Sequence, residues 1–349
     1  MTIDNRSQDA LLSWLHAIPI PVMCLASDQR IAFMNRLATN IFGPDLEGRH
    51  YLNALRQPEL LTVIEDVFRG QEAGELRCQL SALQQERVYD VSVSRTQDGF
   101  LLLSFQDKSD LIDALNIRRD FVANVSHELK TPLTALLGFI ETLSTVAKDD
   151  SVARAQFLQI MQAEALRMDR LVADLLSLSK VEAMERQRPT DKVRVKNLIT
   201  QAVTALAPLL DSQNVTLSET IGDPMCQLVG EADQLLQVIL NLLENAIKYG
   251  GRDQEVQITV TAGIFDERLR TEVVVIEVKD NGPGIDPVHI PRLTERFYRI
   301  DDHRSRALGG TGLGLAIVKH IVSRHRGRLT IESEENEGST FRVSLPMGE

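Results

Sequence analysis

The sequence predicts a multidomain α+β protein made of three consecutive parts. At 349 residues the chain is too long for one hydrophobic core, so two or three domains are expected. Short strand-like runs dominate the first third, helical periodicity dominates the middle, and strands, helices and glycine-rich turns alternate afterwards. We therefore expect domains at residues 1–107, 108–188 and 189–349.

Composition excludes several classes of protein. The chain has 38 basic and 49 acidic residues, and this formal charge of -11 leaves no general basic face, so no direct nucleic-acid partner is expected. The cysteines Cys24, Cys78 and Cys226 lie far apart, which favours a reduced, intracellular compartment. No apolar run approaches the roughly 18 residues that span a bilayer, and the start lacks a signal-peptide pattern. We expect a cytoplasmic protein, either soluble or the soluble part of a longer membrane receptor.

The first region has the pattern of a small α+β domain. Strand-like runs separate mixed helical segments and turns. These runs are Val22–Leu25, Ile31–Asn35, Glu75–Leu80, Val88–Ser94 and Phe100–Phe105. Between the last two, the sequence Gln97-Asp98-Gly99 predicts a hairpin turn.

Residues from about Leu111 to Arg186 are predicted to form two long helices with a polar break at Lys148-Asp149-Asp150. Apolar residues recur along each helix at spacings of three, four or seven. The first series is Val125, Leu129, Leu136, Ile140 and Leu143, and the second is Phe157, Met161, Met168, Leu171, Leu175 and Leu178, with Glu164 as a polar member. Narrow seams of this kind predict an antiparallel hairpin. Pairing with a second copy in a four-helix bundle would bury the seam, so a homodimer is expected. The alternative is packing against the flanking domains.

The first long helix carries His127. Because each residue turns the helix by about 100°, His127 lies about 200° from the seam residues Val125 and Leu129 and points toward solvent. A neutral imidazole nitrogen can act as a nucleophile, and Glu128 is placed to orient the ring or accept its proton. Pro132 removes the hydrogen bond to the Glu128 carbonyl, which predicts a local bend. Taken alone, a histidine on a helix surface is more often a solvated side chain.

A second group of polar residues falls on a predicted helix that Asp233 opens. Asn241, Asn245 and Lys248 occur at i, i+4 and i+7, so they share one face. Amide oxygens and an ammonium group suit magnesium and phosphate, because Mg²⁺ takes oxygen ligands and usually shares its shell with substrate phosphates. An ordinary polar helix face is the alternative explanation of this spacing.

Two glycine-rich elements follow that helix. The first has Asp280 at a strand end, where a buried carboxylate can accept a hydrogen bond from an adenine amino group. Gly282 and Gly284 follow it, and glycine permits close backbone approach. The second element, with Gly310, Gly312 and Gly314, opens a helix whose first backbone N–H groups favour phosphate. Neither matches the Walker A or dinucleotide fingerprint.

The string S-H-E-L-K-T-P at residues 126–132 resembles the phosphoacceptor box of sensor histidine kinases. This resemblance implies that His127 is phosphorylated, that Glu128 assists proton removal, and that Thr131 positions water for dephosphorylating the partner. Residues 195–346 resemble the ATP-binding domain shared by histidine kinases, gyrase, Hsp90 and MutL. A two-layer α/β sandwich is therefore expected there.

The resemblance also implies roles for individual residues. ATP and Mg²⁺ are the expected cofactors, with Asn245 as the metal ligand and Asp280 holding adenine. The other expected nucleotide-site residues are Asn241, Lys248, Tyr249, Gly282, Gly284, Gly310, Gly312 and Gly314. The segment from Ile285 to Gly310 resembles a mobile lid, with Phe297 as its hinge-side anchor and Arg299 as a candidate for the γ-phosphate. Relatives that hydrolyse ATP carry an acidic residue in place of Asn241, so phosphotransfer is expected instead.

Residues 17–107 resemble a PAS sensor domain through I-P-x-P-V, DQRIAFMN and IFGPDLEGR. The stretch ALRQPELL and the domain order resemble the phosphate-regulon sensors of bacteria. These likenesses predict a sensor histidine kinase that phosphorylates His127 with ATP. It would pass the phosphoryl group to an aspartate of a response regulator receiver domain and also act as a phosphatase toward that regulator. The alternatives are a gyrase- or Hsp90-like ATPase without phosphohistidine, and a non-catalytic nucleotide-binding scaffold.

Overall fold

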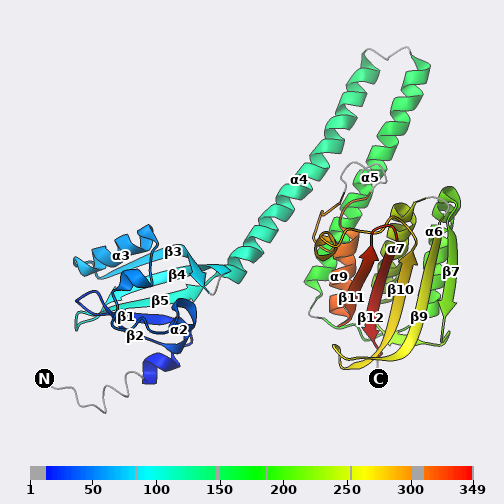
Figure 1. The fold of residues 1–349 in the computed structure, drawn as a ribbon. Helices are drawn as coiled ribbons and strands as arrows, with labels where there is room; N and C mark the ends of the chain where they lie inside the picture. Colours follow the sequence, from blue (N-terminus) through cyan, green and yellow to red (C-terminus); the bar gives the residue numbers. More distant parts are fainter. Residues whose placement is uncertain are drawn as a thin grey trace. The chain divides into compact units, whose positions relative to one another are not determined.

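The computed structural model describes residues 13–82, 85–145, 150–185, 187–251, 254–300 and 310–347. The chain divides into two compact units, residues 1–123 and 124–349 (Figure 1). The division falls within helix α4 (Ser109–Ser144), so one continuous helix belongs to both units. None of the described helices is long and apolar enough to cross a membrane.

The first unit contains a five-stranded antiparallel sheet with the strand order β2-β1-β5-β4-β3. Its strands are β1 (Val22–Leu25), β2 (Ile31–Met34), β3 (Ala73–Ala82), β4 (Gln85–Arg95) and β5 (Leu101–Asp107). Helices α2 (Arg36–Phe42) and α3 (Pro58–Phe68) and the short helix η1 (Tyr51–Asn53) complete it. All five predicted strands are present, and the predicted turn at Gly99 joins β4 to β5, with a φ of 87° at this glycine.

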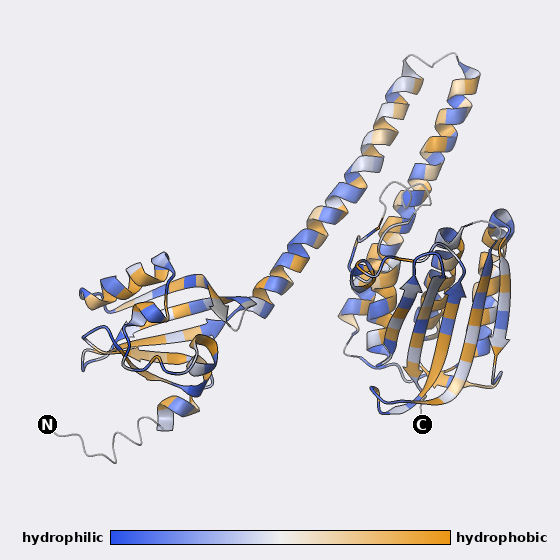
Figure 2. Ribbon diagram, viewed as in Figure 1, coloured by the Kyte–Doolittle hydropathy of each residue, from blue (hydrophilic) through white to orange (hydrophobic). Residues whose placement is uncertain are grey.

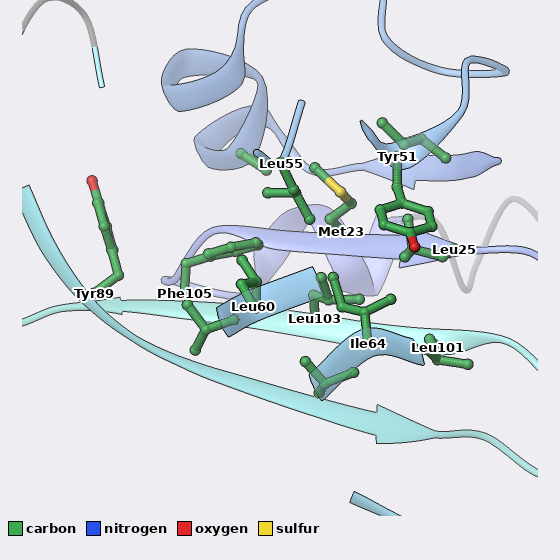
Figure 3. Packing of buried hydrophobic residues seen from close by; sticks show 14 of the residues in the cluster. Met23, Leu25, Tyr51, Leu55, Leu60, Ile64, Tyr89, Leu101, Leu103 and Phe105 are labelled. Carbon is green, nitrogen blue, oxygen red and sulfur yellow. The ribbon is translucent and has the colours of Figure 1, made fainter. Parts of the chain in front are cut away.

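One face of this sheet carries the hydrophobic core of the first unit (Figure 3). Alternation along β5 points Leu101, Leu103 and Phe105 inward, where they meet Leu60 and Ile64 of α3. Since strands β1, β4 and β5 each contribute inward residues, the amphipathic helix α3 and the sheet enclose one apolar layer.

Two long helices form the predicted hairpin: α4 and α5 (Ser151–Ala183). Hydrophobic residues recur along the length of both helices (Figure 2). Asp150 caps α5, because its Oδ1 accepts hydrogen bonds from the backbone N–H groups of Val152 and Ala153, each at 2.9 Å. The other members of the predicted break, Lys148 and Asp149, lie outside the described residues. Helix α4 continues through the buried Pro132, so the bend there stays a prediction.

The second unit also contains a mixed five-stranded sheet with the strand order β11-β12-β10-β9-β7, in which only the β7–β9 pair is parallel among the described strands. The strands are β7 (Thr216–Ile221), β9 (Glu255–Asp266), β10 (Thr271–Asp280), β11 (Arg328–Glu334) and β12 (Gly338–Pro346). Helices α6 (Val195–Gln213), α7 (Ala232–Gly250) and α9 (Gly314–Arg324) pack against it, and η2 (Ile290–Arg292) lies in the segment after β10. Strands β6 (Lys192–Arg194) and β8 (Gln227–Val229) pair separately. The sequence did not predict β6, β7 or β8.

The hairpin packs against its own chain along only part of its length. The C-terminal part of α5 contacts α9 and contains the buried residues Leu171, Leu178 and Val181. The alternative of packing against a flanking domain therefore applies to this part. Other large apolar side chains of the hairpin are exposed in the single chain. Among them are Leu133, Leu137, Ile140, Leu158, Val172 and Leu176.

Candidate functional site

His127 is exposed on α4, as the helical geometry predicts. The next residue, Glu128, is turned inward and its side chain is only 12% exposed. One turn further on, the exposed Thr131 donates a hydrogen bond from its hydroxyl to the His127 carbonyl oxygen at 3.2 Å. The three residues of the predicted phosphoacceptor box therefore have different environments, with the imidazole facing outward and the carboxylate facing the protein.

The Glu128 carboxylate joins the hairpin to the α/β part of the second unit. Its Oε2 atom accepts hydrogen bonds from Nη2 of Arg167, on α5, and from Nη2 of Arg299, each at 3.1 Å. The side chains of Arg167 and Arg299 are 14% and 4% exposed, so water screens these pairs less than it screens a surface ion pair. Arg299 was predicted at the nucleotide site, and the structure adds Glu128 as its partner.

A cleft of about 420 Å³ lies beside Arg299, between the hairpin and the α/β part of the unit. Most of the predicted nucleotide-site residues line it. These are Asn241, Asn245, Lys248, Tyr249, Asp280, Gly284, Arg299, Gly310, Gly312 and Gly314. Gly282 and Phe297 are not among the residues that line it, although both belong to segments that do. The volume falls in the range of small-molecule sites.

Helix α7 presents its polar stripe to this cleft because its opposite face is apolar and buried, including Ile239, Leu242 and Ala246. Asn241 donates from Nδ2 to the Gly314 carbonyl oxygen at 3.4 Å, which ties α7 to the first turn of α9. Lys248 pairs with Glu244 one turn earlier, with 2.6 Å between Nζ and Oε1. Amide, ammonium and carboxylate groups therefore meet on one side of the cleft.

Asp280 ends β10 and is buried at the other side of the cleft. Burial raises the pKa of this carboxyl group, and its Oδ1 accepts a hydrogen bond from the Gly282 backbone N–H at 3.0 Å. A Cβ at Gly282 would lie 2.5 Å from the Cα of Gly250, and Gly284 has a φ of 70°. These two glycines are thus required by the backbone of the protein itself.

Phe297, within the predicted lid, contacts Gly312, which lies two residues after the end of the lid. Phe297 has a φ of 64°, an unusual conformation for a bulky residue, and its N–H donates to the Gly312 carbonyl oxygen at 2.9 Å. A Cβ at Gly312 would lie 2.9 Å from the Cα of Phe297. Residues 301–309 of the lid, including Gly309, lie outside the described residues.

Sequence reasoning missed the contribution of α5 to the cleft. Arg170 and Asp174 line it, and the Thr311 hydroxyl donates a hydrogen bond to Asp174 Oδ2 at 2.6 Å. Burial raises the pKa of Asp174. Together with Arg167 these residues form a stripe at i, i+3 and i+7, but helical spacing alone does not say which surface such a stripe will meet.

Arg324, at the end of α9, fastens the end of the hairpin to α7. Its Nε donates hydrogen bonds to the carbonyl oxygens of Met184 and Gln187 at 3.2 and 3.0 Å, and its Nη1 pairs with the Glu231 carboxylate. Glu231 precedes α7, and its N–H donates to Nε2 of the buried His325 at 3.1 Å. The end of α5 and the start of the asparagine-bearing helix therefore share one guanidinium group.

Two protein families match the chain. The His Kinase A (phospho-acceptor) domain matches residues 117–183, and the Histidine kinase-, DNA gyrase B-, and HSP90-like ATPase family matches residues 230–349. The two matches contain His127 and the α7 cleft residues, respectively. The crystal structure of histidine kinase ThkA in complex with the response regulator protein TrrA is similar in fold, with a TM-score of 0.52 and 20% identity over 96% of this chain and 98% of that chain.

Several sensor kinases are similar in sequence. The phosphate regulon sensor protein PhoR of Pseudomonas aeruginosa is 36% identical over 92% of this chain and 70% of its own length. The sensor-like histidine kinase SenX3 of Mycolicibacterium smegmatis is 37% identical over 71% of this chain, and WalK of Bacillus subtilis is 33% identical over 82%. The chain spans 62% and 45% of those two proteins. From the phosphoacceptor helix to the ATPase domain, it belongs to the sensor histidine kinases.

Proposed function

We propose that this chain uses ATP to phosphorylate its own His127 and then passes the phosphoryl group to an aspartate of a response regulator receiver domain. One observation carries the proposal. Glu128, beside the exposed His127, is hydrogen-bonded to Arg299, which lines the predicted nucleotide cleft. A group suited to accept a proton and a group suited to contact phosphate are therefore already in contact within one unit.

The reaction divides between the two parts of this unit. A neutral imidazole nitrogen of His127 attacks the terminal phosphorus of ATP, and a P–N bond forms while the bond to the bridging oxygen breaks and ADP leaves. Glu128 takes the ring proton. Arg299 offsets the charge that develops on the transferred group. For this to happen the cleft must approach His127, because the imidazole is exposed and His127 is not among the residues that line the cleft.

The cleft suits a magnesium–nucleotide complex. Asn245 offers a neutral amide oxygen as the proposed metal ligand, next to Asn241 and the carboxylate of Glu244. When bound, Mg²⁺ would neutralise phosphate charge. Buried Asp280 would accept a hydrogen bond from the adenine amino group. Lys248, Tyr249 and the N-terminal end of α9 line the same cleft and would contact the phosphates.

We also propose that the chain dephosphorylates its partner. Support comes from Thr131, which follows His127 by one turn and is exposed, so its hydroxyl can reach a water molecule at the surface that carries the histidine. The resemblance of the box at residues 126–132 to the phosphoacceptor box of histidine kinases supports this role for Thr131.

A homodimer is proposed from the exposed apolar residues of the hairpin. Leu137 is 59% exposed and lies on α4 with Leu133 and Ile140, at spacings that form one stripe. A second copy would cover this stripe in a four-helix bundle.

The proposed domain division remains residues 1–107, 108–188 and 189–349. The five-stranded antiparallel sheet and its helices support a PAS-like assignment for the first of these.

The two alternative functions receive less support. An ATPase without phosphohistidine needs no phosphoacceptor domain, yet the phosphoacceptor domain family matches residues 117–183. A non-catalytic scaffold needs no contact between the Glu128 carboxylate and Arg299. Neither alternative accounts for an exposed histidine placed directly beside that carboxylate.

Replacing His127 tests the proposed phosphoacceptor directly. Wild-type protein incubated with MgATP labelled in the γ-phosphate should acquire acid-labile, alkali-stable label, and His127→Gln should acquire none, because glutamine lacks the nucleophilic nitrogen. The exposed His16 provides the matched control, and His16→Gln should be labelled like wild type. Label that persists in His127→Gln, or never appears in wild type, contradicts the proposal.

Thr131→Ala should separate the two proposed activities. Autophosphorylation should stay within about twofold of wild type, while dephosphorylation of a phosphorylated receiver domain slows by about tenfold or more, because one water-positioning hydroxyl is lost. Thr134→Ala is the control, since Thr134 makes the same kind of hydrogen bond, to the Lys130 carbonyl at 2.9 Å. Equal losses of both activities in Thr131→Ala would count against the assignment.

Asp280→Asn should weaken nucleotide binding and stabilise the nucleotide-free fold. Burial raises the pKa of Asp280, so as pH rises past the ordinary carboxyl range the unfolded chain ionises first and folding loses stability. The penalty is complete above the raised pKa. At neutral pH the variant should therefore melt at a higher temperature than wild type, with a smaller difference in acid. Affinity for ATP should fall about tenfold or more as the carboxylate is lost.

Asp286→Asn, at an exposed position after the same strand, is the control and should change neither property. Titration with a fluorescent ATP analogue and thermal melts at two pH values measure both effects. A variant that binds nucleotide as tightly as wild type rules out the adenine role of Asp280.

Leu137→Lys should dissociate the proposed dimer. A charge placed in the bundle interface would be desolvated without a partner, so the dimer dissociation constant should rise by about two orders of magnitude or more. Ala135→Lys adds the same charge at an exposed position about 160° away on α4 and should leave the dimer intact. Sedimentation velocity over a concentration series distinguishes them. A wild-type chain that is monomeric throughout would refute the bundle.

A further inference from the structure

The carboxylate of Asp174 reaches the nucleotide cleft from outside the ATP-binding part of the unit. Asp174 lies on α5, in the hairpin, and its Oδ2 accepts a 2.6 Å hydrogen bond from the Thr311 hydroxyl. Thr311 lies between Gly310 and Gly312, in the segment that leads into α9, and all of these residues line the cleft. A carboxylate thus binds the glycine-rich segment, where phosphate oxygens are expected.

The groups around Asp174 compensate the negative charge of its carboxylate only in part. Arg170 and Lys248 attract its carboxylate, whereas Glu244 repels it. Burial, the largest influence, disfavours the charged form. Ionised Asp174 therefore occupies the cleft at a cost. A half-buried carboxylate whose surroundings disfavour its charged form and that makes one short hydrogen bond is a candidate for a group that exchanges with another anion.

Glu128 repeats the same relation at Arg299. This arginine lines the cleft and is the proposed γ-phosphate contact, but here it donates a hydrogen bond to a carboxylate of the hairpin. Two hairpin carboxylates, one on each helix, therefore engage groups of the cleft that a triphosphate would need. The contacts from Asp174 and Glu128 also attach the hairpin to the α/β part of the unit.

We propose that Asp174 is an intramolecular competitor of the nucleotide phosphates. This inference rests on the proposed nucleotide site. In the nucleotide-free chain the Asp174 carboxylate holds Thr311 and keeps the glycine-rich segment against α5. A nucleoside triphosphate replaces the carboxylate, because two anions cannot share one hydroxyl donor and the narrow space around it. Binding of nucleotide thereby releases the glycine-rich segment from α5, whereas the packing of α5 against α9 is retained.

The competition predicts that the effect of Asp174 grows with the number of phosphates on the ligand. Asp174→Asn retains the shape of the side chain but removes the negative charge. The variant should bind ATP about 3- to 10-fold more tightly than wild type does. Its affinity for ADP should improve by a smaller factor, and its affinity for adenosine should be unchanged, because only the phosphates meet the carboxylate. Isothermal titration of the full chain with adenosine, ADP and MgATP measures this series. Autophosphorylation should show a lower KM for ATP by the same factor and a kcat within about twofold.

Asp169→Asn is the matched control, because Asp169 is an exposed carboxylate on the same helix and its variant should bind all three ligands like wild type. Asp174→Ala provides a second variant, which should also bind ATP more tightly. Equal affinities of wild type and Asp174→Asn for ATP, or weaker binding in the variant, overturn the competition; weaker binding would make Asp174 a ligand of the nucleotide complex. Failure of wild type to bind MgATP would instead overturn the proposed function.

Discussion

The contact of Glu128 with two arginines constrains how the second unit can work. One carboxylate oxygen accepts hydrogen bonds from Arg167, on the hairpin, and from Arg299, which lines the cleft. In this arrangement both guanidinium groups hold the carboxylate, so it is not free to turn toward the His127 ring. Catalysis at His127 requires that at least the Arg299 contact be exchanged for another partner, and phosphate is the chemically matched one.

Where the chain keeps a local pattern, the sequence was sufficient. The five strands of the first unit alternate clearly or follow turn residues such as Gly99, and they formed where expected. Helix α7 has one apolar face, so the side of Asn241 and Asn245 followed from the 3.6-residue period. The outward direction of His127 followed from the same helical geometry, because a residue about 200° from the apolar seam must lie on the opposite side of the helix. In each case the information lies within a few helical turns or one strand.

The rest depended on contacts between distant segments. Strands β6 and β8 have three residues each, and β7, an edge strand with no buried residue, shows no alternation that would reveal it. Asp174 could be placed on α5, but its partner Thr311 is far along the chain. Gly282 was expected to admit a ligand, whereas the structure also gives it the backbone of Gly250 as a neighbour. Helical spacing specifies a face, and only tertiary packing specifies what that face meets.

Arg324 has a mechanical consequence for signalling along the hairpin. Its guanidinium holds the carbonyl oxygens of Met184 and Gln187 and also the carboxylate of Glu231, so three segments are pinned at one planar, rigid group. If the last turn of α5 rotates about its axis, the pin obliges the first turn of α7 to follow or the hydrogen bonds to break. A rotation of the end of the hairpin would thus move the helix that carries Asn241 and Asn245 through Arg324, without any change in the residues that line the cleft.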